Sequence, residues 1–178
     1  NPYGSTASSN AVLTVTNSPT ATTCTPAPSG LVASWKAEGD ATDSVGSNNG
    51  TLLGDTDFTI GEAGQAFNIT NNSQGVRVAP SSSLAVTSIT IEAWIKPTGY
   101  SDHRPILEYG EETGMETVQF MHGWNDPGGT TPGALYGLIR GSNDTSLAIN
   151  SPGGIIPTGQ WSHVAMTFNF TNQTGNLY

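Results

Sequence analysis

Four oxygen-bearing side chains near the start of the chain have the types and spacing of a metal site. Asp40, Asp43, Asn48 and Asn49 lie within ten positions and are interleaved with glycines. Ca²⁺ takes about six to eight oxygen ligands, which carboxylates, amide carbonyls and backbone carbonyls can supply. The alternative is that the same side chains cap turns by hydrogen-bonding nearby backbone N–H groups. Both interpretations fit the sequence.

A second group of residues could recognise a sugar. Carbohydrate sites combine aromatic rings, which pack against apolar ring faces, with planar polar groups that hydrogen-bond hydroxyls. Such residues on or beside the middle runs of the chain are Tyr109, His122, Trp124, Tyr136 and Arg140. The alternative for Trp124 is a loop aromatic that folds back on a sheet. In an extended run, Tyr136 would face the side opposite Leu135 and Gly137, and either side could be the open one.

The acidic residues do not form the pair that glycoside hydrolysis requires. That reaction needs two carboxyl groups about 5–9.5 Å apart, and alternate residues of one strand, roughly 6.6 Å apart, supply them most simply. Glu111 and Glu112 are adjacent and would face opposite sides, and Glu108 has no carboxylate two positions away. The Gly-x-Ser-x-Gly motif of serine hydrolases is absent from the sequence. We therefore expect no catalytic residues and a protein that is not an enzyme.

The composition excludes several classes of protein. The 178 residues include Lys+Arg 5 against Asp+Glu 14, a formal net charge of -9. Five scattered cations cannot displace the counterions of a nucleic acid, so no nucleic-acid partner is expected. No apolar run approaches the roughly 18 residues of a membrane span, so we expect no membrane insertion within this segment. Cys24 is the single cysteine, and any disulfide partner would lie outside the sequence.

Short apolar runs separated by turn residues predict an all-β fold, a sandwich or barrel, with no helical period. The run 89–96 alternates most clearly, with isoleucines and Ala93 on a dry face and Thr90, Glu92, Trp94 and Lys96 on the other. Trp94 would then be half-buried between two sheets or line a groove. The predicted strands are Leu31–Trp35, Gln65–Ile69, Val76–Val78, Ile89–Lys96, Pro105–Tyr109, Thr117–His122, Ala134–Ile139, Thr145–Ile149 and His163–Phe170.

The sequence divides into three zones. Residues 1–16 contain one alternating strand, residues 17–29 are a Pro/Thr-rich linker, and residues 30–178 are the β-rich domain. The turn cluster 171–176 is followed by Leu177-Tyr178, which reads as the start of a strand. We therefore expect the β-rich domain to be incomplete at its C-terminus, so that Leu31–Trp35 or His163–Phe170 exposes an unpaired edge.

Five short motifs follow one another in an informative order. They are Gly-Leu-Val-Ala-Ser-Trp at 30–35, Gly-Gln-Ala-Phe at 64–67, Val-Arg-Val-Ala-Pro at 76–80, Thr-Ile-Glu-Ala-Trp-Ile-Lys-Pro at 90–97 and Gly-Gln-Trp-Ser-His-Val-Ala at 159–165. In this order they resemble a LamG-like (laminin G-like, concanavalin A-like) domain, and the resemblance spans residues 30–178. It implies a concanavalin A/LamG-like jelly-roll sandwich. Separately, Asn1-Pro2-Tyr3-Gly4, Ser8-Ser9 and 11–15 resemble the last hairpin of an immunoglobulin-like domain.

The LamG-like resemblance gives roles to the residues described first. Calcium is common in this family and its relatives, so the resemblance points to calcium as cofactor, with Asp43 as the best ligand and Asn48 as a weaker one. It also places the middle strands in one sheet whose concave face or rim loops bind ligands. His163 is similar to a recurrent structural histidine of the family, and we expect it to hydrogen-bond within the core. The candidate ligand-binding residues remain Tyr109, His122, Trp124, Tyr136 and Arg140.

The two resemblances together imply a modular protein that is extracellular or on a cell surface. We expect a noncatalytic module that binds carbohydrate or a surface protein, assisted by calcium, next to other β domains of the same chain. One alternative is an accessory carbohydrate-binding domain of a glycan-degrading enzyme whose catalytic domain lies elsewhere. Another is a structural spacer without a ligand.

Overall fold

The computed structural model describes residues 27–86, 88–100, 104–110, 117–123, 125–126, 129–130, 132–140, 146–169 and 171–178. The chain divides into two compact units, Asn1–Leu31 and Val32–Tyr178. The proposed immunoglobulin-like hairpin at 1–16, Cys24 and most of the linker 17–29 lie outside the described residues. The second unit contains the described strands and is considered by itself below.

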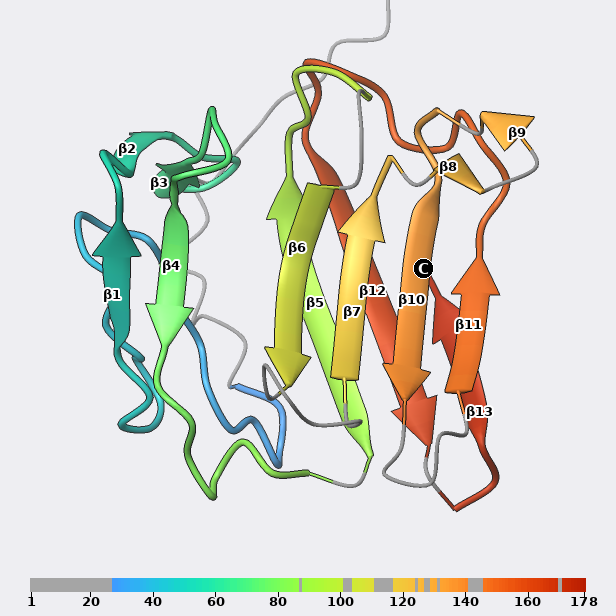
Figure 1. Cartoon of the computed structure of the whole chain (residues 1–178). Coiled ribbons are helices and arrows are strands. Elements are labelled where there is room, and N and C mark those ends of the chain that lie inside the picture. The colour runs from blue at the N-terminus through green and yellow to red at the C-terminus, as the bar shows by residue number, and fades with distance from the viewer. Residues whose placement is uncertain are drawn as a thin grey trace, which may run out of the picture. The chain divides into compact units, whose positions relative to one another are not determined.

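Every secondary-structure element in the described residues is a β-strand, which confirms the predicted all-β class (Figure 1). The prediction located most of them to within one or two residues, but it missed β1, β2, the two-residue strands β8 and β9, and most of β13. The strands are β1 (Gly50–Leu53), β2 (Asp57–Ile60), β3 (Gln65–Asn68), β4 (Gly75–Val78), β5 (Ile89–Ile95), β6 (Arg104–Gly110), β7 (Thr117–His122), β8 (Asn125–Asp126), β9 (Gly129–Thr130), β10 (Leu135–Arg140), β11 (Ser146–Asn150), β12 (Ser162–Asn169) and β13 (Thr174–Leu177).

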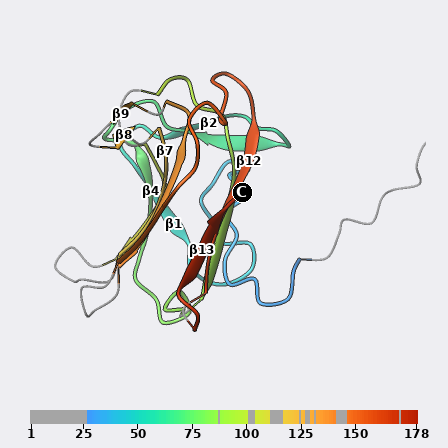
Figure 2. The ribbon, with the colours of Figure 1, turned by 90° about the vertical axis from the view of Figure 1, so that its right-hand side faces the viewer.

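Two antiparallel sheets form a sandwich. One has four strands in the order β11-β10-β7-β6, and the other has three in the order β13-β12-β5. Figure 2 shows the two sheets edge-on and facing each other. Three further pairs, β1 with β4, β2 with β3 and β8 with β9, are also antiparallel.

The core lies between the two sheets. Phe120 of β7, Leu135 of β10, and Val164 and Met166 of β12 are the largest fully buried side chains. They form one cluster with Ile91 of β5. Each of these strands alternates, so the intervening residues point outward. Burying apolar surface at about 25 cal/mol per Å² makes this layer the main favourable term for pairing the sheets.

The alternation predicted for β5 is confirmed, but the side of β5 that carries Trp94 faces outward from the sandwich. Trp94 is 53% exposed and therefore does not lie between the sheets. His163 pairs directly with Trp94 across β5 and β12, so it lies on this outer face rather than in the core. The expected core hydrogen bond of His163 is therefore wrong, because Val164 and Met166 take the inward positions of its strand.

Two other strand expectations are also wrong. Leu31–Trp35 is not a strand beyond a single bridge between Trp35 and Asp43, because the Ser34 N–H donates to the Asp43 carboxylate instead of to a ladder partner. The run 163–170 does not present an unpaired edge, because β12 pairs with β13 on one side and β5 on the other.

Gly137 of β10 lies where the two sheets pack closely together. A Cβ atom at this position would lie 2.6 Å from Met166 Sδ and 2.9 Å from Ile149 Cγ1. We expect Gly137→Ala to lower the free energy of unfolding by about 1–3 kcal/mol, because overpacking displaces core side chains. Chemical denaturation measures the effect. Gly75→Ala is the matched control, since a Cβ on that β4 residue would meet nothing within 4 Å; equal stability of the two variants would contradict the packing described.

Candidate functional site

The outer face of the four-stranded sheet is the first candidate site. The strand registers arrange its outward positions in rows that cross the sheet. One row is Pro105, Met121, Tyr136 and Asn150. The next is Glu108, Gln119, Leu138 and Ala148, and Arg140 and Ser146 follow as neighbours in the third.

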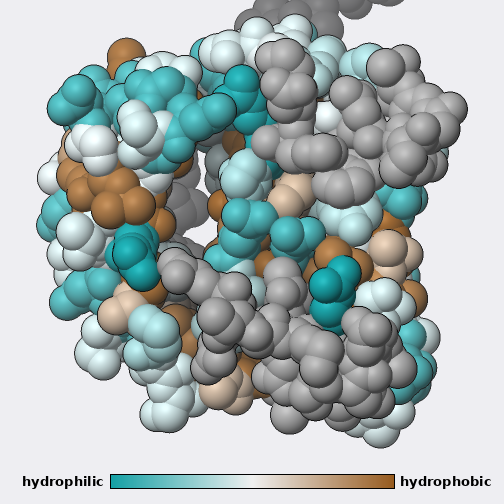
Figure 3. Space-filling model, viewed as in Figure 1, coloured by the Kyte–Doolittle hydropathy of each residue, from teal (hydrophilic) through white to brown (hydrophobic). Residues whose placement is uncertain are grey.

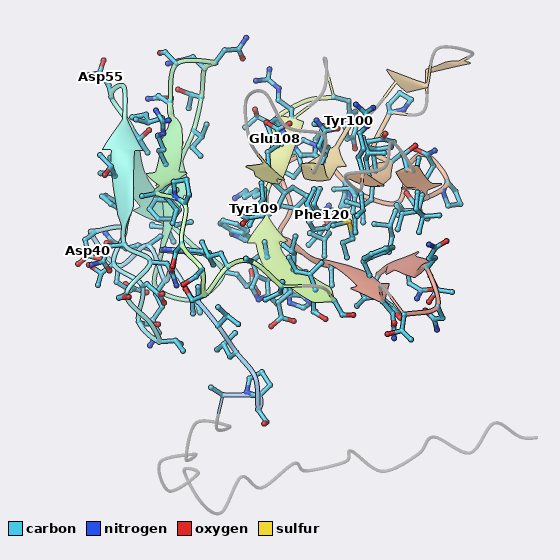
Figure 4. All side chains as sticks on the ribbon, turned by 60° about the horizontal axis from the view of Figure 1, so that its bottom comes forward. Asp40, Asp55, Tyr100, Glu108, Tyr109 and Phe120 are labelled. Atoms are coloured by element: carbon cyan, nitrogen blue, oxygen red, sulfur yellow. The ribbon has the colours of Figure 1, made fainter. Side chains whose placement is uncertain are left out.

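The predicted ligand-binding residues separate onto the two sides of this sheet. Tyr136 and Arg140 lie on the outer face, on the side opposite Leu135 and Gly137 as alternation predicts. Tyr109 lies opposite Val118, which packs on the core, so it belongs to the inner face. In Figure 4, Tyr109 and Phe120 lie between the sheets, whereas Glu108 lies on the other side of β6. Trp124 lies outside the described residues.

His122 also faces inward, which makes it an interior residue rather than a ligand-presenting one. It lies opposite both Arg104 and the fully buried Leu135. Among the described residues, its buried Nδ1 atom has no hydrogen-bond partner. Burial, and then the nearby Arg104 charge, lower the pKa of His122, so the imidazole is neutral at pH 7.

Only part of the outer face is open. Met121 and Tyr136 are buried, and burial raises the pKa of Tyr136 despite the opposing effect of the nearby Arg140. Glu108, Arg140 and Asn150 are exposed, with Gln119 and Leu138 half-buried between them. The Gln119 Nε2 group donates a 3.2 Å hydrogen bond to Glu108 Oε1. In Figure 3, hydrophilic and hydrophobic residues lie side by side over the middle of this face.

The second candidate site is the loop around Asp43. Its carboxylate is buried and accepts four hydrogen bonds from N–H donors. Oδ1 accepts from the backbone of Ser34 and Val45, at 2.9 and 3.0 Å. Oδ2 accepts from the backbone and the side chain of Asn48, both at 3.1 Å. The Asn48 Oδ1 atom in turn accepts from the Ser83 hydroxyl at 2.9 Å, so the loop is tied to a distant turn.

These bonds fix the charge of Asp43. Burial alone would raise its pKa, but the backbone N–H groups of Ser34, Gly46, Val45 and Asn48 together outweigh burial and lower the pKa well below the usual range. The carboxylate is therefore ionised at neutral pH, and these N–H dipoles stabilise its negative charge.

A family model described as the concanavalin A-like lectin/glucanases superfamily matches residues 70–178, more than half of the chain. The chain belongs to this superfamily. The match runs from β4 to β13 and so includes both sheets of the sandwich. Searches of curated proteins and of solved structures returned no match. For residues 30–69 and the hairpin at 1–16, the resemblance stays a prediction.

Calcium, which the superfamily resemblance implied at Asp43 and Asn48, does not fit their donor set. A carboxylate offers about four acceptor positions, and N–H groups occupy four on Asp43. A cation would have to displace these donors, whose hydrogens point toward it. The turn-capping alternative that the sequence left open is therefore the one this geometry favours.

The sequence did not identify Glu108, Gln119 and Leu138 as ligand-binding candidates. From the sequence, Glu108 stands out only as a possible catalytic acid, and the spacing of Gln119 and Leu138 is not distinctive. The signal that places them together is the pairing of β6, β7 and β10. Alternation within each strand was available from the sequence, but the register between strands was not.

Replacing Asp43 should destabilise the domain. We expect Asp43→Ala to lower the free energy of unfolding by about 2–4 kcal/mol, because it leaves buried donors unsatisfied. Asp43→Asn should cost less. Since the folded pKa lies below the unfolded value of about 3.9, the charge-dependent stabilisation is complete above that pH and is lost as pH falls below it. The wild-type and Asn variants should therefore converge in acid, as measured by chemical denaturation.

The control for this experiment is Asp40→Ala in the same loop. Asp40 is exposed, and its Oδ1 atom accepts a hydrogen bond from the Thr42 N–H at 2.9 Å. Its loss should cost less than about 1 kcal/mol. An Asp43→Ala variant as stable as Asp40→Ala would contradict the assigned role.

Calcium should not stabilise the protein through the Asp43 loop. We expect millimolar CaCl₂ to leave the melting temperature of the wild type unchanged, because a ligand raises stability only if it binds the folded state. Differential scanning fluorimetry in CaCl₂, with MgCl₂ and matched NaCl as controls, measures this. A calcium-specific rise that disappears in Asp43→Asn would show that the cation does bind there.

Proposed function

We propose that this chain is a noncatalytic module that binds carbohydrate through the outer face of its four-stranded sheet. The observation that carries the proposal is the row Glu108, Gln119 and Leu138 beside Arg140. It brings a carboxylate, an amide, an aliphatic surface and a guanidinium together on one open face. These are the groups that satisfy sugar hydroxyls in pairs and cover the apolar face of a sugar ring.

The dimensions of the face suit a short stretch of a glycan chain. Neighbouring strands lie about 4.8 Å apart, so four strands present a strip roughly 14 Å wide. The hydrogen bond between Gln119 and Glu108 orients the two planar groups before a ligand arrives. Preorganised groups lose little side-chain entropy on binding, which favours affinity.

The described residues of this face lack the arrangement of a glycoside hydrolase. That chemistry needs two carboxyl groups about 5–9.5 Å apart. Glu108 is the single acidic residue at the described outward positions of the sheet. Its carboxylate is engaged with the Gln119 amide, which can bind a sugar but cannot replace a second acid. This supports binding without catalysis.

A surface protein is the second ligand class that the sequence suggested. Carbohydrate is favoured because the open part of the face is mainly polar, while its apolar members Met121 and Tyr136 are buried. An accessory domain of a glycan-degrading enzyme would use the same binding chemistry, whereas a spacer would need none of it.

We propose that the protein is extracellular or on a cell surface, beside other β domains of the same chain, because of its family relationship. Among the described residues, no helix has the length and apolarity to cross a membrane.

Arg140 offers a direct test of the binding face. We expect the wild type to bind members of an immobilised glycan array, and Arg140→Ala to weaken that binding at least about tenfold, since hydrogen bonds to a charged group are worth about 1.5–3 kcal/mol. Surface plasmon resonance on the best glycans gives the affinities.

The matched control is Arg77→Ala, which removes an exposed arginine from β4, outside the four-stranded sheet. It should bind as the wild type does. Equal loss in both variants would show that net charge, not the proposed face, determines binding. A wild type that binds no glycan would overturn the proposed function in favour of a protein ligand or a spacer.

A further inference from the structure

The outer face of the three-stranded sheet carries an exposed indole that the core does not use. Trp94 alternates with the inward Ile91, Ala93 and Ile95 of β5, and it is 53% exposed. Burying a large apolar side chain contributes about 1.5–3 kcal/mol, much of which is unrealised at this position. An exposed tryptophan among charged groups is more informative than an exposed leucine, because indoles recur where ligands bind.

The neighbours of Trp94 hold its ring in place. His163 lies directly opposite on β12, with ring centroids 5.2 Å apart and an interplanar angle of 55°. The Nε2 atom of His163 lies 3.8 Å from Glu92 Oε2. The indole thus contacts the His163 ring on one side, while much of its surface stays open.

A small residue and two further aromatic residues lie beside this ring. Ala165, a small residue, lies between Glu92 of β5 and Tyr178. Tyr178 is 68% exposed, and its backbone exchanges hydrogen bonds of 2.9 and 3.0 Å with Ala165. On the other side of the Trp94–His163 pair, Lys96 Nζ lies 5.9 Å from the centre of the Trp161 ring. We call Trp94, His163, Glu92, Ala165 and Tyr178 the Trp94 platform.

We propose that the Trp94 platform is a second binding site for a neutral glycan chain. The indole would cover the apolar face of one sugar ring, while the Glu92 carboxylate and the His163 imidazole would bond hydroxyls at its edge. This site lies on the side of the sandwich opposite the Glu108–Arg140 face. The inference rests on the proposed function for its ligand class, but it concerns different residues.

The charges of the platform select a neutral ligand. The Glu92 carboxylate lies on one side of the Trp94–His163 pair and the Lys96 ammonium, over the Trp161 ring, lies on the other, so one negative and one positive side chain flank the indole. A polyanion would meet the Glu92 carboxylate and a chain with a formal net charge of -9. A stable protein interface buries about 800 Å² on each partner. The exposed apolar surface of the platform consists of the separate rings of Trp94 and Tyr178, which argues against a protein partner.

Two sites on opposite faces would let the module bind two polysaccharide segments at the same time. A single flexible polysaccharide cannot easily reach both sheets of one sandwich, so the two sites would engage different chains or distant parts of one chain. Binding to a polysaccharide-coated surface would then gain from effective concentration without any new contact. The second site would therefore matter most with polymeric ligands.

Affinity electrophoresis of the full chain tests the platform. The gels contain laminarin, yeast mannan or dextran as neutral polysaccharides, and heparin as the charged comparator. We expect the wild type to be retarded in at least one neutral gel, and Trp94→Ala to weaken that interaction at least about tenfold. Trp94→Phe, which keeps an aromatic ring, should retain part of the retardation. Thr90→Ala, which changes an outward residue elsewhere on β5, should behave as the wild type.

Melting temperatures show whether each variant is folded, and Arg140→Ala in the same gels separates the two proposals. Weaker retardation of both Trp94→Ala and Arg140→Ala, with no retardation of the double variant, would support two sites. Weaker retardation of Arg140→Ala, with wild-type retardation of Trp94→Ala, would overturn the platform and leave the proposed function standing. Weaker retardation of Trp94→Ala alone would support the platform and overturn binding through the Glu108–Arg140 face. Retardation by heparin alone, or self-association in sedimentation that Trp94→Ala abolishes while glycan binding persists, would overturn a neutral glycan as occupant.

Discussion

The dry layer between the two sheets is the constraint on which the rest of the domain depends. Phe120, Leu135, Val164 and Met166 are fully buried there, and they come from three strands that are far apart in the sequence. Side chains alternate along a strand, so a register slip of one residue would turn each of these groups outward. The same packing that excludes water therefore determines which polar residues reach each outer surface.

That dependence explains how far the sequence could be interpreted. Alternation identified the dry face of β5 and placed Tyr136 opposite Leu135. It could not say that Trp94 and His163 face solvent, because a tryptophan and a histidine are compatible with either side of a sheet. It also could not bring Glu108 beside Gln119, since that neighbourhood exists only through the pairing of β6 with β7. β1 and β2 were missed because they are short and partly polar.

The Asp43 loop shows how one chemical pattern can serve two purposes. Acidic and amide side chains between glycines can surround a cation, yet here the glycine-rich backbone folds inward and presents its own N–H groups to the carboxylate. Oxygen-rich composition alone does not distinguish the two cases. The difference lies in whether the backbone turns its carbonyl oxygens or its N–H groups toward the acid.

The loop also affects how the protein ages. An asparagine followed by glycine deamidates when the next backbone nitrogen attacks the side-chain amide. In Asn49-Gly50, however, the Gly50 N–H donates to the Ala41 carbonyl at 2.8 Å, and the Asn49 Oδ1 atom accepts from the Asp43 N–H at 3.0 Å. Both reacting groups are held by these bonds, so ring closure requires the loop to open first. The hydrogen bonds that organise the loop thus also protect the Asn49 side-chain amide from deamidation.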